Sequence, residues 1–248
     1  MQGYLRSFSE SKHWLLQLIE QVVENVKKKR HQTPGKTFFQ SLIQKCSGMA
    51  STYFGLMFLW ASLANAIPMT FWTLCFVLDN PSVLTKLVNE IRTSFSTPSG
   101  NVIGNYEETL KRMPYLKCCV LEAIRLRPPG VIVRRVVKAF TVGGYTIPKG
   151  DLFGVAILVS QKCRDRWKTT DLDKNQFLEG FISFGGGRYQ CPGRWFALME
   201  IQMYIAILLS RYDCQLLGDV PDISRQHLVG TQQPVSPCPF RYSIISNQ

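Results

Sequence analysis

The sequence lacks several features that define common classes of protein. Among its 248 residues and eight cysteines we find no secretory leader, no internal repeat and no cysteine pair with metal-ligand spacing. The basic run at 27–31 is accompanied by no zinc-finger spacing and no nucleic-acid motif. We therefore expect no disulfide framework and no nucleic-acid partner. Cysteines in apolar runs (Cys75, Cys118 and Cys119) are expected to be buried free thiols.

Acidic residues are also scarce. Asp and Glu number 17 against 29 Lys and Arg, which gives a net charge of +12, while hydrophobic residues make up 46% of the chain. That hydrophobic content is typical of a globular protein with a substantial core. The basic balance favours a partner with an acidic surface or an anionic membrane.

Charge is absent altogether from residues 47–78, the longest apolar segment. Its length would allow a single membrane span at 53–78. Asn65 and Pro68 interrupt its middle, however, and the flanking charges are weak. We therefore favour a long helix at about 50–78 that is buried in a protein core.

The remaining periodicities predict a mainly α chain with a minor β-sheet. A proline pair followed by glycine at 128–130 ends one helix, after which β-branched and turn residues take over. The expected elements are helices at 11–30, about 50–78, from 81, about 115–127 and from Pro192 to about 212, short strands at about 131–159, and a C-terminal hairpin at about 227–246.

The stretch "FGGGRYQCPG" (184–193) surrounds one cysteine, Cys191, with glycine and proline just before an expected helix. The positive end of a helix dipole and its unpaired N–H groups favour a thiolate there. Glycines let the backbone approach a large flat group closely. One thiolate cannot hold a bare metal ion, but it can supply one axial ligand to iron held in a macrocycle.

This stretch resembles the haem-binding loop of the cytochrome P450 superfamily, whose fixed positions are filled by Phe184, Gly187, Cys191 and Gly193. The resemblance implies haem b, with Cys191 as the axial ligand of the iron. In many members an arginine two residues before the cysteine pairs with a haem propionate. Tyr189 occupies that position and Arg188 lies one residue earlier, so the propionate contact is lost or shifted.

Other motifs of the same family follow in the right order. Glu122 and Arg125 match its Glu-x-x-Arg element, which is structural and supports the haem loop. In the strand "VRRVVK", Arg135 best fits the arginine that reaches a propionate, and Arg134 fits less well. A surface ion pair and a solvated strand face are the simpler alternatives.

In the charge-free helix, Asn65 occupies the position where most members have the threonine that assists proton delivery to oxygen. This departure resembles the branch of sterol and oxysterol 7α-hydroxylases, which also contains prostacyclin synthase. The resemblance implies an NADPH- and O2-dependent monooxygenase of cholesterol and bile-acid metabolism, with Asn65 as a catalytic contact. A peroxide isomerase resembling prostacyclin synthase and a non-catalytic fragment are the alternatives, and a locally satisfied polar residue beside Pro68 is the simpler explanation of Asn65.

The resemblance also implies partners and a location. These are a sterol substrate, O2, the flavoprotein NADPH-cytochrome reductase, and the endoplasmic reticulum membrane. The match covers only the C-terminal half of the family's fold, so we expect a truncated domain over 1–248 without the N-terminal anchor. A meander near 160–167 is also shorter than in the family. We accordingly expect weak haem binding and little or no turnover by this chain alone.

Overall fold

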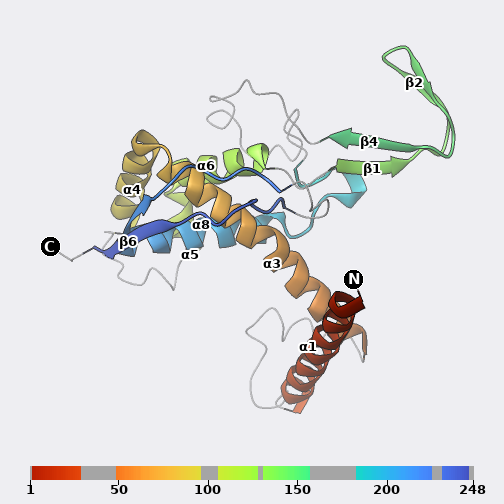
Figure 1. Ribbon diagram of the computed structural model, residues 1–248, viewed down its shortest axis with the longest axis horizontal. Coiled ribbons are helices and arrows are strands. Elements are labelled where there is room, and N and C mark those ends of the chain that lie inside the picture. The colour runs from red at the N-terminus through yellow and green to blue at the C-terminus, as the bar shows by residue number, and fades with distance from the viewer. Residues whose placement is uncertain are drawn as a thin grey trace. The chain divides into compact units, whose positions relative to one another are not determined.

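The computed structural model describes residues 2–28, 49–95, 106–127, 131–156, 183–224 and 231–245. By its internal contacts the chain divides into two units, Met1–Leu63 and Ala64–Gln248. The described residues are mostly helical, with three small antiparallel sheets (Figure 1). The expected fold class is therefore confirmed. The shortened meander near 160–167 lies outside the described residues.

The first unit contains helix α1 (Gln2–Lys28) and the beginning of α3 (Met49–Leu78). The helix predicted at 11–30 thus begins earlier in the chain. Ile19 and Val23, four residues apart, are buried on one face of α1, and Leu15 and Leu56 pack against them. This spacing is that of an amphipathic helix.

Helix α3 is the charge-free segment, and its second half lies in the core of the second unit. Trp72 is fully buried. The hydroxyls of Thr70 and Thr73 are satisfied by the carbonyls of Ala66 and Met69, one turn earlier in the helix. In the described part of the chain, Thr52–Leu78 is the one segment long and apolar enough to cross a membrane, a property that it shares with core helices of soluble proteins.

Helices α4 (Pro81–Phe95), α5 (Tyr106–Lys111), α6 (Pro114–Leu126) and α8 (Arg194–Arg211) complete the core of the second unit, and α8 contacts each of the other three. The fully buried members of this core have apolar side chains: Trp72, Leu87, Ile91, Met113, Leu116, Val120, Ile205.

The start of α6 is capped by a carboxylate from another helix. The two oxygens of Glu90 on α4 accept hydrogen bonds from the backbone N–H groups of Tyr115 and Leu116, each at 2.9 Å. These N–H groups have no partner within their own helix, and a negative charge at a helix N-terminus is favourable. Glu90 therefore fixes the position of the helix that carries Glu122 and Arg125.

Two hairpin-like sheets follow α6. Strand β1 (Val131–Arg135) pairs with β4 (Leu152–Ala156), and β2 (Phe140–Val142) pairs with β3 (Tyr145–Ile147). The turn between β2 and β3 consists of Gly143 and Gly144, with φ of 56° and 82°. Two consecutive positive φ values are what a tight two-residue turn between antiparallel strands requires.

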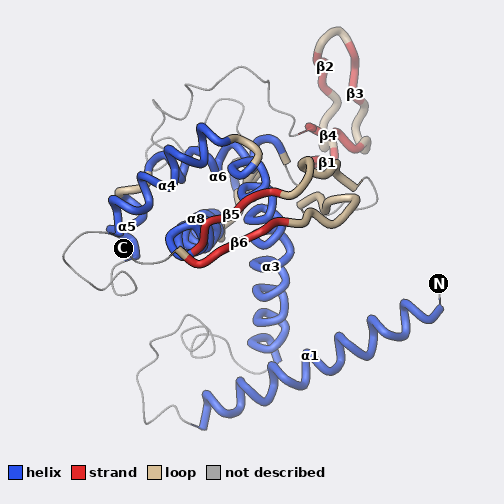
Figure 2. The backbone as a smooth tube through the Cα atoms, turned by 60° about the vertical axis from the view of Figure 1, so that its left-hand side comes forward, coloured by secondary structure: helices blue, strands red, loops and turns tan. Residues whose placement is uncertain are grey.

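The third sheet corrects the prediction for the C-terminus. Among the described residues, β6 (Phe240–Ile244) pairs with β5 (Tyr212–Leu216), which directly follows α8, rather than with a neighbour inside 227–246. Figure 2 shows the two strands side by side. The predicted hairpin was wrong in its pairing because the partner strand lies before the intervening loop, where local sequence gives no signal of it.

Candidate functional site

The loop that carries Cys191 is held by its own backbone. The N–H of Cys191 donates to the carbonyl of Phe184 at 2.8 Å, which closes the loop at its base. Gly185 and Gly187 have φ of 75° and 60°, and Gly187–Tyr189 forms a short 3-10 turn, η1. Phe184 packs partly buried against the core of the second unit. The loop is thus anchored at Phe184 and projects from there.

One glycine of the loop leaves little room for a side chain. A Cβ at Gly185 would lie 3.3 Å from the carbonyl oxygen of Tyr189, in a backbone conformation that L-residues rarely adopt. Glycine at position 185 therefore lets the backbone turn tightly at the start of the loop.

Cys191 lies three residues before α8, and its side chain is exposed. Helix α8 begins at Arg194 with Gly193 as its N-terminal cap, directly after the loop at 184–193, and Pro192 lies just before its first turn. The guanidinium of Arg194 donates to the carbonyl of Cys191 at 3.0 Å. The first residue of α8 thus fixes the backbone that presents the thiol.

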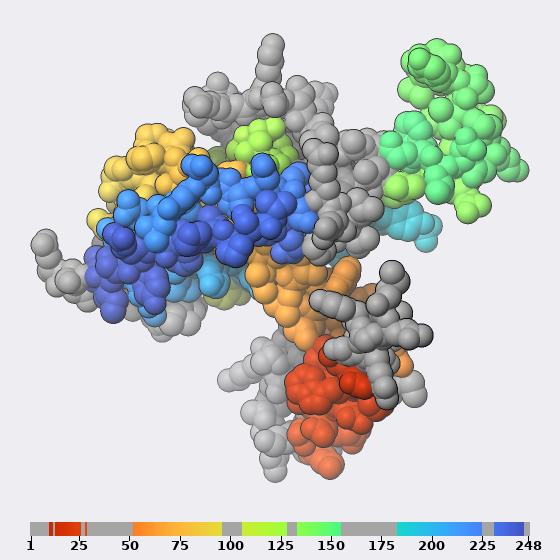
Figure 3. Space-filling model, in the orientation of Figure 1, coloured from red at the N-terminus to blue at the C-terminus, as the bar shows by residue number. Residues whose placement is uncertain are grey.

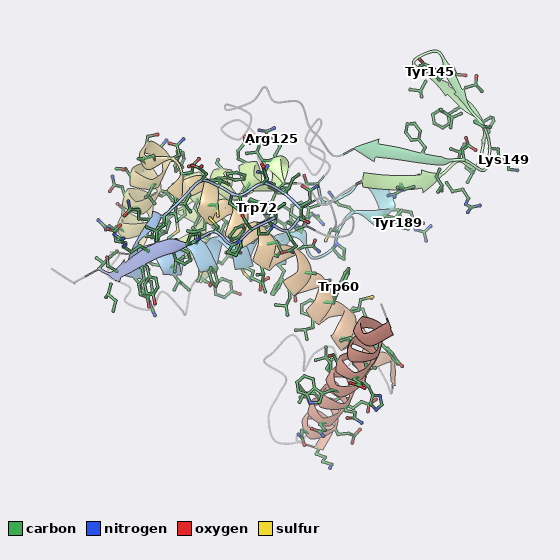
Figure 4. All side chains as sticks on the ribbon, viewed as in Figure 1. Trp60, Trp72, Arg125, Tyr145, Lys149 and Tyr189 are labelled. Carbon is green, nitrogen blue, oxygen red and sulfur yellow. The ribbon has the colours of Figure 1, made fainter. Side chains whose placement is uncertain are left out.

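Strand β1 lies next to this loop. The guanidinium of Arg134 lies over the ring of Tyr189, 5.3 Å from its centre, and that of Arg188 lies 6.0 Å from it. Figure 4 shows Tyr189 beside β1. Successive residues of a strand point to opposite faces, so Arg135 is directed away from the face that Arg134 shares with Tyr189. The family resemblance favours Arg135 over Arg134 as the arginine that reaches a propionate, whereas the arginine that contacts the loop at Tyr189 is Arg134.

Tyr189 is highly exposed, at 71% of its full accessible surface, and Arg135 and Arg188 are exposed as well. Three cationic side chains, those of Arg134, Arg135 and Arg188, are therefore carried on the loop and on the strand beside it. Such a group is suited to bind an anionic ligand such as a carboxylate.

Glu122 and Arg125 on α6 form the pair that their spacing predicts. Nε of Arg125 donates to one carboxylate oxygen of Glu122 at 2.8 Å, and Nη2 donates to the other at 2.6 Å. This two-point geometry is the strongest arrangement available to an arginine and a carboxylate. The side chain of Arg125 is only 10% exposed, so the pair belongs to the interior rather than to the solvated surface.

Asn65 contacts a residue that sequence reasoning missed. Its amide oxygen accepts a hydrogen bond from the backbone N–H of Thr231 at 3.0 Å and from the Thr231 hydroxyl at 3.2 Å. Thr231 lies 166 residues away in sequence, so the expectation of a purely local partner near Pro68 does not account for these bonds. The local sequence around Thr231 carries no pattern that indicates this contact.

A glycine loop that presents one exposed cysteine ahead of a helix, in a mostly helical chain, can supply a single thiolate ligand to the iron of a haem. The cytochrome P450 family model matches residues 2–239. The chain therefore belongs to the cytochrome P450 family. Members of this family hold haem through a cysteine thiolate on the iron.

The chain is similar to curated members of the family. It is 39% identical to the 24-hydroxycholesterol 7-alpha-hydroxylases of Mus musculus and Homo sapiens, over 96% of this chain and 54% of each relative. It is 29% identical to the 25-hydroxycholesterol 7-alpha-hydroxylase of Rattus norvegicus, over 81% of this chain and 58% of that protein. The chain thus spans about half the length of the curated relatives it matches.

The residues present fit a haem group. The loop offers one exposed sulfur, a donor set that suits an iron with its other ligands supplied by a macrocycle. Gly185, where a Cβ would lie 3.3 Å from the carbonyl oxygen of Tyr189, keeps the tight turn of the loop free of a side chain. The exposed arginines of β1 and η1 match the anionic propionates of haem in charge.

Proposed function

We propose that the chain forms the cysteine-bearing part of a haem-thiolate monooxygenase that hydroxylates an oxysterol at the 7α position. The observation that carries this proposal is the exposed thiol of Cys191 on a backbone-closed glycine loop before α8. Haem, when bound, supplies the chemistry that activates O2 for insertion of one oxygen atom.

In this proposal the residues of the loop and of β1 hold the cofactor. Cys191 is the axial ligand, and Phe184 forms the apolar base of the loop. Arg188, Tyr189 and the neighbouring Arg134 pair with the propionates through charge and hydrogen bonding, in place of Arg135, which points to the other face of β1. The exposure of these side chains supports the assignment, since a buried arginine or cysteine could not reach an external ligand.

In the same proposal Asn65 contacts oxygen or substrate. A carboxamide both donates and accepts hydrogen bonds, so it can bind a sterol hydroxyl or orient a proton donor. The two hydrogen bonds that Thr231 donates to the amide oxygen support this role, because they fix which way the carboxamide points. Glu122 and Arg125 have a structural role and do not touch the substrate.

The relatives suggest 24-hydroxycholesterol as the substrate, since that sterol appears in the names of those that match 96% of the chain. Electrons are proposed to come from NADPH through a flavoprotein reductase at the endoplasmic reticulum membrane. The exposed cations Arg188 and Arg134 support docking of an acidic partner near the cysteine loop, as does Arg194, which bonds to the carbonyl of Cys191.

The 248-residue chain by itself is proposed to hold haem weakly and to turn over slowly. The support is the openness of the site, since Cys191 and Tyr189 are both exposed to water. Water that reaches the ligand sulfur competes for it and weakens the electrostatic interactions of the site.

The test is a spectroscopic titration of the haem-loaded chain with 24-hydroxycholesterol, 25-hydroxycholesterol and cholesterol. We expect a substrate-induced shift of the haem absorption band that is strongest for 24-hydroxycholesterol and weaker in Asn65→Ala. Product analysis with the reductase separates hydroxylation from isomerisation, because conversion that proceeds without NADPH contradicts the monooxygenase. Equal responses to all three sterols contradict the proposed substrate.

A further inference from the structure

Two cysteines far apart in sequence face each other in the second unit. The sulfur of Cys75 on α3 and the sulfur of Cys238 lie 3.7 Å apart, within hydrogen-bonding distance for thiols, although 163 residues separate them. Cys238 lies two residues before β6. Both are free thiols in the structure. Such a separation is short enough for a small movement of the two side chains to bring the sulfurs into bonding contact.

The segment that contains Cys238 is already attached to α3 at two other points. The indole N–H of Trp72 donates to the carbonyl of Gln232 at 2.8 Å, and Thr231 bonds to Asn65 as described above. Three contacts therefore join α3 to this segment: 65 to 231, 72 to 232 and 75 to 238. We call residues 231–238 the α3 strap.

We propose that Cys75 and Cys238 form a redox-sensitive pair whose disulfide fastens the α3 strap to α3. The oxidant is a peroxide, with hydrogen peroxide as the probe. This inference concerns thiols outside the cysteine loop, and it does not depend on haem binding or on the identity of a substrate.

The reaction balances as two steps. In the first step the Cys238 sulfur attacks one oxygen of hydrogen peroxide, the O–O bond breaks, and the products are a Cys238 sulfenic acid and one water. In the second step the Cys75 sulfur attacks the sulfur of Cys238, the S–O bond breaks, and the leaving hydroxide takes the thiol proton to become a second water. The two thiols together lose two electrons and two protons, and the peroxide is reduced to two waters.

The environments of the two thiols assign the order of these steps. Cys75 is buried, and burial together with its hydrogen bond to Cys238 raises the pKa of Cys75 to about 12. The neutral, buried thiol is a poor first nucleophile. Cys238 is only partly buried, so it is the sulfur that a peroxide in solution reaches first.

The other described cysteines provide internal references. Cys191 is exposed, so its modification reports how much oxidant has reacted. Cys214 is buried and lies in β5, the partner strand of the β6 strand that follows Cys238. Cys118 and Cys119 are adjacent in α6, so their side chains project from different faces of that helix. The Cys75–Cys238 pair differs from all of these because its two sulfurs already touch.

The experiment oxidises the full 248-residue chain with hydrogen peroxide until Cys191 is completely modified. The chain is then digested without reductant, and the peptides are mapped by mass spectrometry. We expect a linked pair of peptides that contains Cys75 and Cys238 and that disappears on treatment with dithiothreitol. We also expect the backbone amide of Thr231 to exchange with deuterium at least ~10-fold more slowly after oxidation, because the closed strap opens less often.

The variants separate the pair from general oxidation. Cys238→Ser is expected to lose both the linked peptide and the slower exchange, and Cys214→Ser is expected to keep both. The peptide mapping of the oxidised wild-type chain tests the proposal even if neither variant folds. Absence of the linked peptide when Cys191 is fully modified, or predominant linkage of Cys75 to another cysteine, overturns the proposal.

Discussion

Replacing Glu122 by glutamine tests whether the Glu122–Arg125 pair is a structural element of the interior. The change preserves the shape of the side chain and removes its charge, so Arg125, a nearly buried cation at 10% exposed, loses its two-point pairing with the Glu122 carboxylate. An exposed ion pair contributes about 0.2–1 kcal/mol, whereas breaking a buried one costs about 3–5 kcal/mol.

The geometry of the pair decides where the cost of breaking it lies between the exposed and the buried case. The two short hydrogen bonds, at 2.6 and 2.8 Å, and the burial of Arg125 place the cost of breaking the pair near the upper limit. Glu122 is 35% exposed, and water around its carboxylate lowers that cost. We therefore expect Glu122→Gln to lower the free energy of unfolding by about 2–4 kcal/mol. The assay is equilibrium unfolding in guanidinium chloride followed by circular dichroism, with linear extrapolation to water.

The chain offers a matched control. Glu108 on α5 also pairs with a cation three residues later, Lys111, at 3.0 Å, but their side chains are 56% and 60% exposed. Glu108→Gln is expected to change the free energy of unfolding far less than Glu122→Gln does, because water screens an exposed pair. If Glu122→Gln costs no more than Glu108→Gln, the claim that the former pair is an interior support is refuted.

Three further predictions follow from the described contacts. Glu90→Gln leaves one oxygen to serve two backbone N–H groups of α6, so the free energy of unfolding is expected to fall by about 1–3 kcal/mol in the same assay; no change contradicts the cap. Thr231→Val removes the hydroxyl bond to Asn65 and is expected to speed deuterium exchange across 231–238, whereas unchanged exchange contradicts the anchoring role. Burial raises the pKa of Cys119 from 9.0 to about 12, so the folded chain keeps a proton there that the unfolded chain loses. This contribution to the free energy of unfolding is complete below pH 9.0 and is lost as the pH rises to about 12. The free energy of unfolding is therefore expected to decline less steeply over this pH range in Cys119→Ala than in the wild type. Identical pH profiles of the two proteins contradict the raised pKa of Cys119.

Much of the helical part of the fold follows from local sequence. The charge-free run predicts α3, and the proline pair at 128–129 predicts the end of α6, which the structure places at Leu126. The spacing of Glu122 and Arg125 predicts their pair because side chains three apart share a helix face. Each of these signals acts within a few turns of the chain, where periodicity and backbone restrictions are decisive.

The contacts that join distant segments could not be predicted in the same way. The pairing of β5 with β6 depends on how the segments pack. The same holds for the bonds from Thr231 to Asn65, 166 residues apart, and for the approach of Cys75 to Cys238, 163 residues apart, because no local pattern encodes so distant a partner. At the cysteine loop, the motif identified Cys191 from sequence. The proximity of Arg134 to Tyr189 required the actual direction of each side chain on β1.

The central claim is that the sulfur of Cys191 is the ligand of haem iron. The most direct measurement is the absorption spectrum of the reduced chain, reconstituted with excess haem and saturated with carbon monoxide, in the wild type and in two variants. The account predicts the strongly red-shifted band of thiolate ligation in the wild type and in Cys214→Ala, and its loss in Cys191→Ala. A thiolate band that persists in Cys191→Ala, or that is absent from the wild type, contradicts the account.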